Sequence, residues 1–394
     1  MMKNSLIPCL VFTFAFCGCN TEKAQTSESI NPEAEVEEVY LIDIEEILKN
    51  EVSVKLSEIA DTIEYIELKA DGNTVIFATQ IFASEQHLFV ISKGNLYQFT
   101  MDGTLLRQIG RRGQGPGEYA GLGNLMIDDE NDIIGLSDVQ TPFIHYYSTK
   151  DGSFLHSHKL PYGRKTDLFY KDSLFYISAY PDGKLKNLLT ILNHKHDTLG
   201  CIPNYDFYTN EGSYGYIGSV YSNLYTYDNR LFFKGFNDHD TIWELKGTEY
   251  RVHAIIDKGK YKSPRYFGSE MFQRQRNGEG SYYRINQAQE DDRYIYITLS
   301  PYWNPYMRSP LIMYEKREKK GFFTFGRFEN DITGGHVFSP NIFTDSHYIS
   351  TIEAQVLLDK EDTYINASPS FKNFIKTLNE DSNTILIKAK RKRQ

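Results

Sequence analysis

Four glycines recur along this chain at a nearly constant interval, and this interval restricts the fold more than any other feature of the sequence. Gly103, Gly152, Gly200 and Gly247 are separated by 49, 48 and 47 residues. The tripeptide His-Asp-Thr also repeats, at residues 196–198 and again 43 residues later at 239–241. A period in the forties that contains several short strands is typical of a β-propeller, in which each unit forms one blade.

Short runs rich in β-branched and aromatic residues fill these intervals, with no long amphipathic helix between them. The chain contains 29 tyrosines and 25 phenylalanines, residues that favour strands. We expect strands at Ile63–Leu68, His87–Ser92, Leu96–Thr100, Asp132–Leu136, Phe143–Ser148, Leu174–Tyr180, Leu188–Leu192, Leu231–Gly235, Thr241–Leu245, Tyr294–Leu299 and Leu311–Glu315. They fall into small antiparallel groups, so the predicted fold class is all-β.

The number of blades follows from the period. The stretch from Asp61 to Glu353 holds about six units. Because a ring must be closed, we expect Thr62–Leu68 and Thr384–Lys388 to complete one blade from opposite ends of the chain. The stretch at about 257–280 is predicted to be an insertion, and residues 355–358 and 371–378 a small C-terminal helical patch. Residues 51–394 are thus predicted to form a six-bladed β-propeller of four-stranded antiparallel blades.

The densest cluster of glycines lies at residues 108–119, in the run Gln-Ile-Gly-Arg-Arg-Gly-Gln-Gly-Pro-Gly-Glu-Tyr. Glycine permits positive φ angles and Pro116 fixes one φ, so this segment can continue neither a helix nor a strand. Strand-like runs flank it on both sides. We interpret it as a shaped loop that crosses from one blade to the next.

Residues 1–18 are predicted to be a lipoprotein signal peptide. Lys3 precedes the apolar run Leu6–Phe16, which is too short to span a bilayer as a mature helix. The run ends in Phe16-Cys17-Gly18-Cys19, which looks like a bacterial lipoprotein box with Cys19 as the lipidated residue; a plain signal peptide cut nearby is the alternative. Residue 20 is not the aspartate associated with inner-membrane retention. The resemblance therefore implies a lipid anchor in the outer membrane, with the periplasmic face and the cell surface both left open.

Residues 19–50 are predicted to be a flexible acidic tether that ends in a docking segment. Ser27–Glu38 carries five glutamates and little that could pack, whereas Tyr40–Leu48 is apolar enough to dock as a short strand or helix. After the signal and Cys19 are set aside, Cys201 is the only remaining thiol. We therefore expect no intramolecular disulfide and disfavour a thiol-disulfide enzyme.

Several segments together resemble a known family. They are the lipoprotein box, Asp61–Leu68, Gly113–Tyr119, Asp240–Trp243 and Asn383–Ile387. These look like the six-bladed β-propeller lipoproteins abundant in Bacteroidota, which are related in architecture to NHL-repeat propellers. The resemblance covers nearly the whole mature chain and implies the fold. It implies little about function, because propellers host binding, scaffolding and catalysis alike.

The common catalytic motifs are missing from the sequence, which has no phosphate-binding loop, nucleophile elbow or His-Glu-x-x-His motif. Some similar propellers are metal-dependent lyases or lactonases with ligands around the central channel. The matching candidates here are His145, His156, His158, His194, His196, His239 and His336. The two His-x-His pairs have ligand-compatible spacing, but their polar neighbours favour exposed outer-strand histidines. We predict no catalytic residues, metal ligands or cofactor, with Ca²⁺ or Zn²⁺ in the channel as the alternative.

Two groups are candidates for ligand binding. Arg111 and Arg112 lie in the glycine-rich segment, whose backbone N–H groups favour anions; an ordinary inter-blade loop with solvated charges is the alternative. Tyr302, Trp303 and Tyr306 offer flat rings that suit a sugar or a peptide, with Arg265 of the predicted insertion as a polar neighbour. Packing between blades is the competing explanation for these aromatic residues.

Three classes of function are compatible with these features. The preferred one is an envelope-anchored, non-catalytic propeller that binds a peptide, glycan or partner protein. The alternatives are a metal-dependent lyase or hydrolase with its site in the channel, and a structural subunit of an outer-membrane transport or polysaccharide-use complex. The net charge of −9 argues against general nucleic-acid binding. We expect a monomeric propeller whose membrane contact is its lipid anchor.

Overall fold

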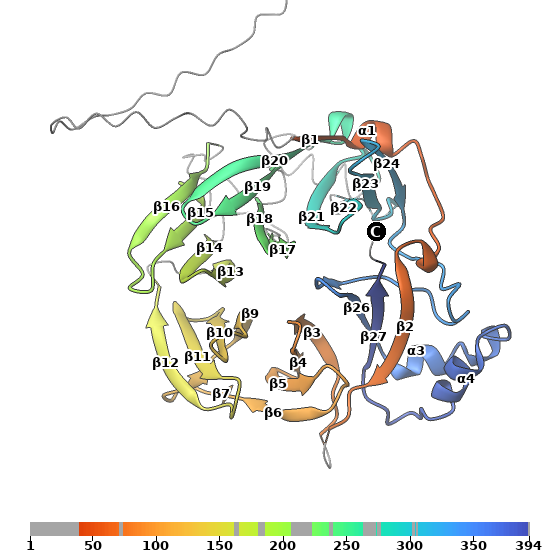
Figure 1. The fold of residues 1–394 in the computed structure, drawn as a ribbon, viewed down its shortest axis with the longest axis horizontal. Coiled ribbons are helices and arrows are strands. Elements are labelled where there is room, and N and C mark those ends of the chain that lie inside the picture. Colours follow the sequence, from red (N-terminus) through yellow and green to blue (C-terminus); the bar gives the residue numbers. More distant parts are fainter. Residues whose placement is uncertain are drawn as a thin grey trace, which may run out of the picture. The chain divides into compact units, whose positions relative to one another are not determined.

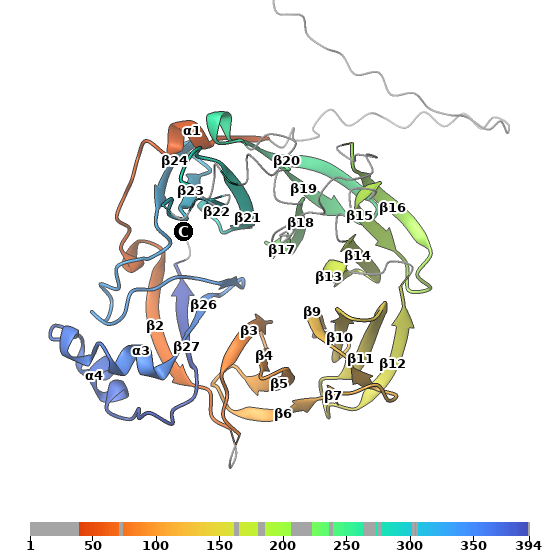
Figure 2. The same ribbon diagram turned by 180° about the vertical axis from the view of Figure 1, so that it is seen from behind.

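Six small sheets surround a common centre in the computed structural model, one for each blade (Figures 1 and 2). The structure describes residues 39–392 except 71–73, 161–164, 180–185, 206–222, 236–238, 263–272, 274–276, 302–303 and 305. The signal peptide at 1–18, Cys19, the tether as far as residue 38, Arg265, Tyr302 and Trp303 lie outside these described residues. The predicted six-bladed propeller of four-stranded antiparallel blades is confirmed.

Within each of the first five blades the strands follow one another outward from the centre in chain order. Blade I contains β3 (Ala78–Ala83), β4 (His87–Ser92), β5 (Asn95–Thr100) and β6 (Leu105–Ile109); blade II contains β9 (Leu122–Asp128), β10 (Ile133–Asp138), β11 (Phe143–Ser148) and β12 (Phe154–Lys159); blade III contains β13 (Lys165–Lys171), β14 (Leu174–Ala179), β15 (Asn187–Leu192) and β16 (Thr198–Pro203); blade IV contains β17 (Asn223–Tyr227), β18 (Arg230–Lys234), β19 (Thr241–Lys246) and β20 (Glu249–Asp257); blade V contains β21 (Tyr283–Glu290), β22 (Tyr294–Pro301), β23 (Leu311–Glu315) and β24 (Lys320–Thr324).

The sixth blade is assembled from both ends of the described chain. Its order is β25 (Ile342–Phe343), β26 (His347–Ile352), β27 (Ile385–Arg391) and then β2 (Ala60–Glu67). β2 pairs antiparallel with β27, from Ala60 opposite Arg391 to Glu67 opposite Ile385. The sequence prediction of a blade shared between the two ends is therefore confirmed. The closure gives β2 a sheet partner, so that it does not remain an open strand.

The residues before β2 lie along three consecutive blades. β1 (Tyr40–Asp43) adds a fifth, parallel strand to β20 of blade IV, and α1 (Ile44–Ile47) follows it with Asp43 as its side-chain cap. Further on, Val52 N–H donates to the Phe323 carbonyl of blade V at 2.9 Å. The short 3₁₀ helix at Leu56–Glu58 then leads into β2 of blade VI. Residues 39–59 are called the N-terminal strap below.

Two short helices, α3 (Ala354–Leu358) and α4 (Pro369–Ile375), lie between β26 and β27 and form the predicted helical patch. α4 begins at the Ser368 cap with Pro369 in its first turn, as helix geometry favours. Its Phe371 ring packs against Tyr65 of β2, with centroids 4.7 Å apart. The helices thus cover the outside of the closing blade (Figure 1). No helix among the described residues is long and apolar enough to cross a membrane.

The turns between third and fourth strands explain the glycine interval. Gly103, Gly152 and Gly247 occupy these turns with φ angles of 82°, 76° and 61°, which glycine adopts most easily. Gly200 instead lies inside β16, so its place in the sequence interval was wrong. In blade III the left-handed position belongs to His196, with a φ of 64°. The two His-Asp-Thr tripeptides are likewise not equivalent, because residues 239–241 precede a third strand.

Candidate functional site

The connections between strands divide unequally between the two faces of the ring. Since successive strands alternate in direction, the connections from second to third strand and from one blade to the next emerge on one face, called the loop face below. The longest intervals of chain between consecutive strands begin and end on this face: they join β16 to β17, β20 to β21, β22 to β23, β24 to β25 and β26 to β27. On the opposite turn face, the longest links between neighbouring strands are 149–153 and 193–197. Binding residues of scaffolded folds concentrate on such long loops.

The glycine-rich loop leaves blade I on the loop face and enters blade II, as the sequence predicted. Arg111 and Arg112 form a two-residue strand, β7, which pairs with β8 (Glu118–Tyr119). The Arg111 Nε lies 2.6 Å from Glu118 Oε1, and Gly115 N–H donates to Glu118 Oε2 at 2.8 Å. The chain's own carboxylate therefore occupies the Arg111 guanidinium and one backbone N–H of the predicted anion site. Arg112 is exposed and has no partner among the described residues.

The shape of this loop has a packing cause. Gly110 has a φ of 57°, and a Cβ there would lie 2.8 Å from the Tyr147 hydroxyl. Tyr147 is buried and donates to the Gly117 carbonyl at 3.2 Å, while the buried Tyr119 hydroxyl accepts from Leu96 N–H at 3.3 Å. The loop is thus fixed between blades I and II, and Arg112 projects from a rigid base.

Tyr306 lies on the loop face of blade V and is 80% exposed. The buried Asn304 holds its connection in place, accepting from Tyr306 N–H at 3.0 Å and donating to the Gly280 carbonyl at 2.9 Å. The Tyr306 ring passes over Gly278, where a Cβ would come within 2.8 Å of the ring. Tyr306 and Arg112 share the loop face, but they belong to opposite sides of the ring (Figure 1). The structure therefore does not gather them into one pocket.

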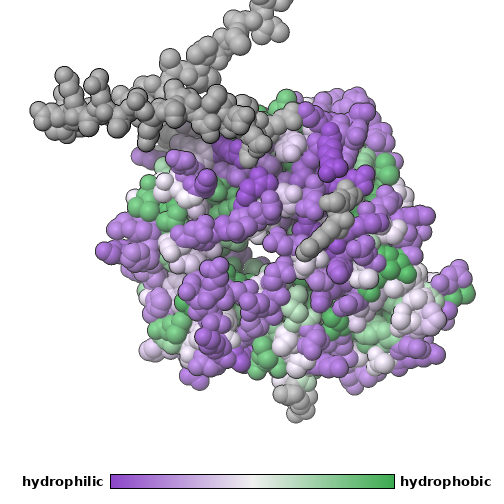
Figure 3. All heavy atoms as spheres, viewed as in Figure 1, coloured by the Kyte–Doolittle hydropathy of each residue, from purple (hydrophilic) through white to green (hydrophobic). Residues whose placement is uncertain are grey.

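The middle of the ring presents a second polar region, which sequence reasoning missed. Figure 3 shows a narrow hollow at the centre of the ring, bordered largely by hydrophilic residues. The innermost strands have a sheet partner on one side only, so their other edges carry backbone groups that need partners. Asp167 of β13, in blade III, supplies such a partner to blade IV, because its Oδ2 accepts from Leu224 N–H of β17 at 2.7 Å. Its Oδ1 accepts from Asn124 Nδ2 of β9 at 3.2 Å.

The Asp167 side chain thus joins neighbouring blades and is called a clamp below. A second clamp joins blades IV and V. Asn223 of β17 donates through Nδ2 to the Ala288 carbonyl of β21 at 2.6 Å, and its Oδ1 accepts from Ala288 N–H at 3.0 Å. Side-chain amides and one carboxylate thus connect blades II, III, IV and V around the channel. These residues were missed because short, polar inner strands carry little hydrophobic periodicity. A polar residue at or near the start of each such run was the only available signal.

Asp167 is also chemically unusual among the described carboxylates. Burial raises the pKa of Asp167 to about 7, although its hydrogen bonds from Leu224, Leu168 and Asn124 act in the opposite direction. A carboxyl group with this pKa changes its protonation state near neutral pH and is a candidate for polar recognition in the channel.

Asp167→Asn should remove one component of the pH dependence of stability. In the unfolded chain the carboxyl has a pKa near 4. The folded chain therefore binds more protons between about pH 4 and pH 7, and this group makes the wild type more stable as the pH falls through that window. Between pH 8 and pH 5 we expect the free energy of unfolding to rise by on the order of 2 kcal/mol more in the wild type than in the variant. Urea unfolding of both proteins at pH 5 and pH 8 measures it.

The control for this prediction is Asp172→Asn on the same blade. Asp172 is exposed in the turn after β13, and its φ of 51° is tolerated by asparagine. This variant should keep the pH dependence of the wild type. If Asp167→Asn also keeps it, the carboxyl of Asp167 does not titrate near neutral pH.

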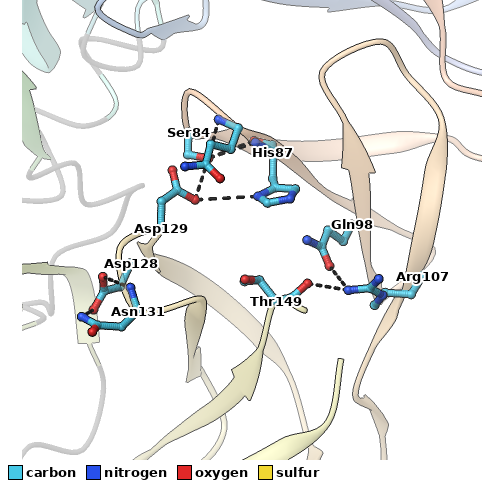
Figure 4. A network of polar contacts seen from close by, with 9 residues as sticks. Ser84, His87, Gln98, Arg107, Asp128, Asp129, Asn131 and Thr149 are labelled. Atoms are coloured by element: carbon cyan, nitrogen blue, oxygen red, sulfur yellow. Dashed lines mark hydrogen bonds and ion pairs between the residues drawn. The ribbon is translucent and has the colours of Figure 1, made fainter. Parts of the chain in front are cut away.

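On the turn face, a serine, a histidine and an aspartate meet between blades I and II (Figure 4). The Ser84 hydroxyl donates to Asp129 Oδ1 at 3.1 Å, and His87 Nδ1 lies 3.8 Å from the same oxygen. In a catalytic triad the histidine stands between the serine and the carboxylate. Here the carboxylate stands in the middle, so this group links two blades and does not activate the serine.

The histidines named from the sequence do not surround the channel. His145 lies on β11, His156 and His158 lie on β12, and the others lie in connections, whereas none of the described innermost strands contains a histidine. Among the described residues, no group of three or more His, Cys, Asp or Glu side chains is arranged to hold a metal ion. A small open cavity lies on the turn face between blades V and VI, lined by Asp291, Tyr294 and Tyr348 among others.

Comparisons with known proteins place this geometry in context. A family model described as "Domain of unknown function (DUF4934)" matches residues 39–390. A solved structure from Bacteroides fragilis, whose name describes it only as exported, is 17% identical, with a TM-score of 0.67 and coverage of 90% of this chain and 100% of its own. A duf4221 family member from Bacteroides vulgatus is 13% identical, with a TM-score of 0.47 and coverage of 87% and 98%. No curated protein matches the sequence.

Proposed function

Since the chain belongs to the family described as "Domain of unknown function (DUF4934)", which carries no assigned activity, we propose a function from the geometry: an exported, envelope-anchored propeller that binds a peptide, glycan or partner protein on its loop face. The lipoprotein box ending at Cys19 supports the anchor in the outer membrane. The similar protein of Bacteroides fragilis, which is named as exported, supports the envelope location. The NHL-like relationship belongs to this proposal and not to the findings.

The observation that carries the proposal is the unequal distribution of connections. Long connections emerge on one face, while the other face has short turns between neighbouring strands. Short turns are enough to connect the strands of a blade, so the additional length on the loop face is not needed for strand pairing, although part of it, including α4, packs against the closing blade. A rigid ring that presents variable loops is a common design for recognition. Arg112 and Tyr306 are exposed side chains on rigidly held parts of this face.

Variants of the loop face should lose binding while variants elsewhere should not. We expect Arg112→Ala and Tyr306→Ala to weaken binding about tenfold each, because exposed arginine and tyrosine side chains dominate many interfaces. Glycan and peptide arrays probed with the chain from Asn20 onward identify a ligand, and titration of each variant with that ligand gives the affinity.

The matched controls are Arg317→Ala and Tyr250→Ala. Arg317 is exposed in the turn between β23 and β24, on the turn face, and Tyr250 is 42% exposed on β20, the fourth strand of blade IV. Both should keep the wild-type affinity. Loss of binding in the controls, with none in Arg112→Ala or Tyr306→Ala, would place recognition away from the loop face and contradict the proposal.

A further inference from the structure

His196 occupies a backbone position that the corresponding turns of blades I, II and IV give to glycine. Its φ of 64° falls in the left-handed region, which a residue with a Cβ adopts at a cost. Gly103, Gly152 and Gly247 avoid this cost in the equivalent turns. Strained backbone of this kind persists where the surrounding structure holds it in place, and Lys319 adopts it in the equivalent turn of blade V. The contacts of the His196 side chain show what surrounds this position in blade III.

The His196 ring lies in the wedge between blades II and III. It stacks on His158 of β12, with centroids 3.1 Å apart and planes 6° from parallel, and on Phe175 of β14 at 4.8 Å. The neighbouring His156 stacks on Tyr146 of β11 at 4.5 Å. Both ring nitrogens of His196 are buried without a hydrogen-bond partner. The outer strand of blade II and the turn 193–197 of blade III are thus joined by two stacked imidazoles.

The groups around this stack would stabilise a protonated imidazole only weakly. His156 lies beside it on β12, where the Tyr146 ring of β11 stacks on it, and Tyr170 of β13 packs against Phe175, the second ring beside His196. On the turn itself are His194 and Asp197, of which only the aspartate favours a charged His196. Asp197 is already engaged, since its carboxylate accepts from Asn193 Nδ2 at 3.1 Å.

Joint metal binding does not explain the stack. A metal ion lies close to the plane of each imidazole that binds it, and two parallel planes 3.1 Å apart cannot contain the same ion. The described residues also hold no metal-compatible group here. Proton binding needs no such shared geometry, because each ring can take up a proton by itself once the stack opens.

We propose that the His158–His196 stack is a proton-sensitive contact, and that acidification loosens β12 and the turn 193–197 from each other while the other blades stay folded. When closed, the stack holds two neutral rings against each other. When open, both rings reach water and can be protonated. Protons thus act as a ligand of the open form.

The pH window follows from the direction of the shifts. Burial and the neighbouring histidines lower the pKa of His196 to about 4, and burial lowers the pKa of His158 below its usual value of about 6.5. The open form therefore binds more protons than the closed form below pH 6.5. The contact is complete above that pH and is lost as the pH falls towards 4. For His196 alone, opening should become up to about tenfold easier per pH unit.

Hydrogen exchange followed by mass spectrometry tests the proposal on the soluble chain. After correction for the intrinsic exchange rate, peptides that cover 154–159 and 193–198 should lose protection about tenfold between pH 7 and pH 5.5. Peptides that cover the equivalent Gly103 turn of blade I should not. Uniform loss across all blades, or no loss at 154–159 and 193–198, overturns the proposal.

Two variants and a control separate a proton effect from ordinary packing. His196→Gly restores the residue used by the equivalent turns, and His158→Gln removes the partner ring from an outer strand. His196→Gly should make exchange at these segments nearly independent of pH between 7 and 5.5, and His158→Gln should reduce the pH dependence. His194→Gln, at an exposed histidine on the same turn, should behave as the wild type. Unchanged pH dependence in His196→Gly and His158→Gln overturns the proposal.

Discussion

Replacing Asp291 by alanine is expected to lower the free energy of unfolding by about 4 kcal/mol. Asp291 lies in the turn between β21 and β22 and is 5% exposed. Its Oδ1 accepts from Arg293 N–H at 2.8 Å and from Tyr294 N–H at 2.6 Å. Its Oδ2 accepts from the hydroxyls of Tyr296, at 2.6 Å, and Tyr348.

The size of this effect comes from the donors that would be left behind. Tyr296 belongs to blade V and Tyr348 to blade VI, and both are almost completely buried. Each buried donor without an acceptor costs about 1–3 kcal/mol, part of which water entering the adjoining cavity would recover. The carboxylate also joins two blades, so its loss weakens the contact between them as well as one turn.

The neighbouring residue supplies the control. Asp292 follows directly in the chain and is exposed, so Asp292→Ala should change the free energy of unfolding by no more than about 0.5 kcal/mol. Urea unfolding of the three proteins measures both values. Similar losses in the two variants would show that the turn's acidity, and not the buried network, stabilises this part of the ring.

Gly103→Ala is expected to destabilise the fold by about 3 kcal/mol. The left-handed backbone alone costs alanine about 1 kcal/mol. In addition, the new Cβ would lie 2.6 Å from Ile66 Cγ2 and 2.8 Å from the Glu67 carbonyl oxygen, at the end of β2. A main-chain oxygen cannot move aside as a flexible side chain can, so the turn of blade I would be pushed away from the closing blade.

Gly247→Ala tests the same backbone conformation without the clash. Gly247 has a φ of 61° in the corresponding turn of blade IV, and nothing lies within 4 Å of a Cβ placed there. This variant should lose only about 1 kcal/mol. Chemical denaturation of both variants gives the difference, which should be about 2 kcal/mol. Equal losses would mean that the contact between the Gly103 turn and β2 contributes little to closure.

Much of the fold was predictable because the middle strands of each blade are buried on both faces. Runs such as His87–Ser92 and Tyr294–Leu299 are apolar in the sequence itself, so they can be recognised as strands without knowledge of their neighbours in the fold. The closing pair of β2 and β27 was predictable from the need to cover open edges. The inner strands were not predictable in this way, because β25 has only two residues and because β3, β9, β13 and β21 contain register shifts.

The candidate site was less accessible to sequence reasoning than the fold. Arg111 looked available for a ligand, but its pairing with Glu118 depends on how the six residues between them turn back. The clamp formed by Asp167 depends on the neighbouring blades, which contribute Asn124 and Leu224 from distant parts of the chain. His196 was hidden by Gly200, which kept the glycine interval nearly constant although Gly200 lies inside β16 and not in the turn.

Closure of the ring depends on β27, the last strand of the described chain. β2 is made early, yet its partner β27 lies more than 300 residues later, so that pairing is among the longest-range contacts of the fold. A chain that stops anywhere before residue 385 leaves β2 and β26 with unpaired edges. Such a fragment offers unpaired strand edges to other chains and backbone to proteases. A truncated translation product therefore exposes edges that β27 covers in the longer chain.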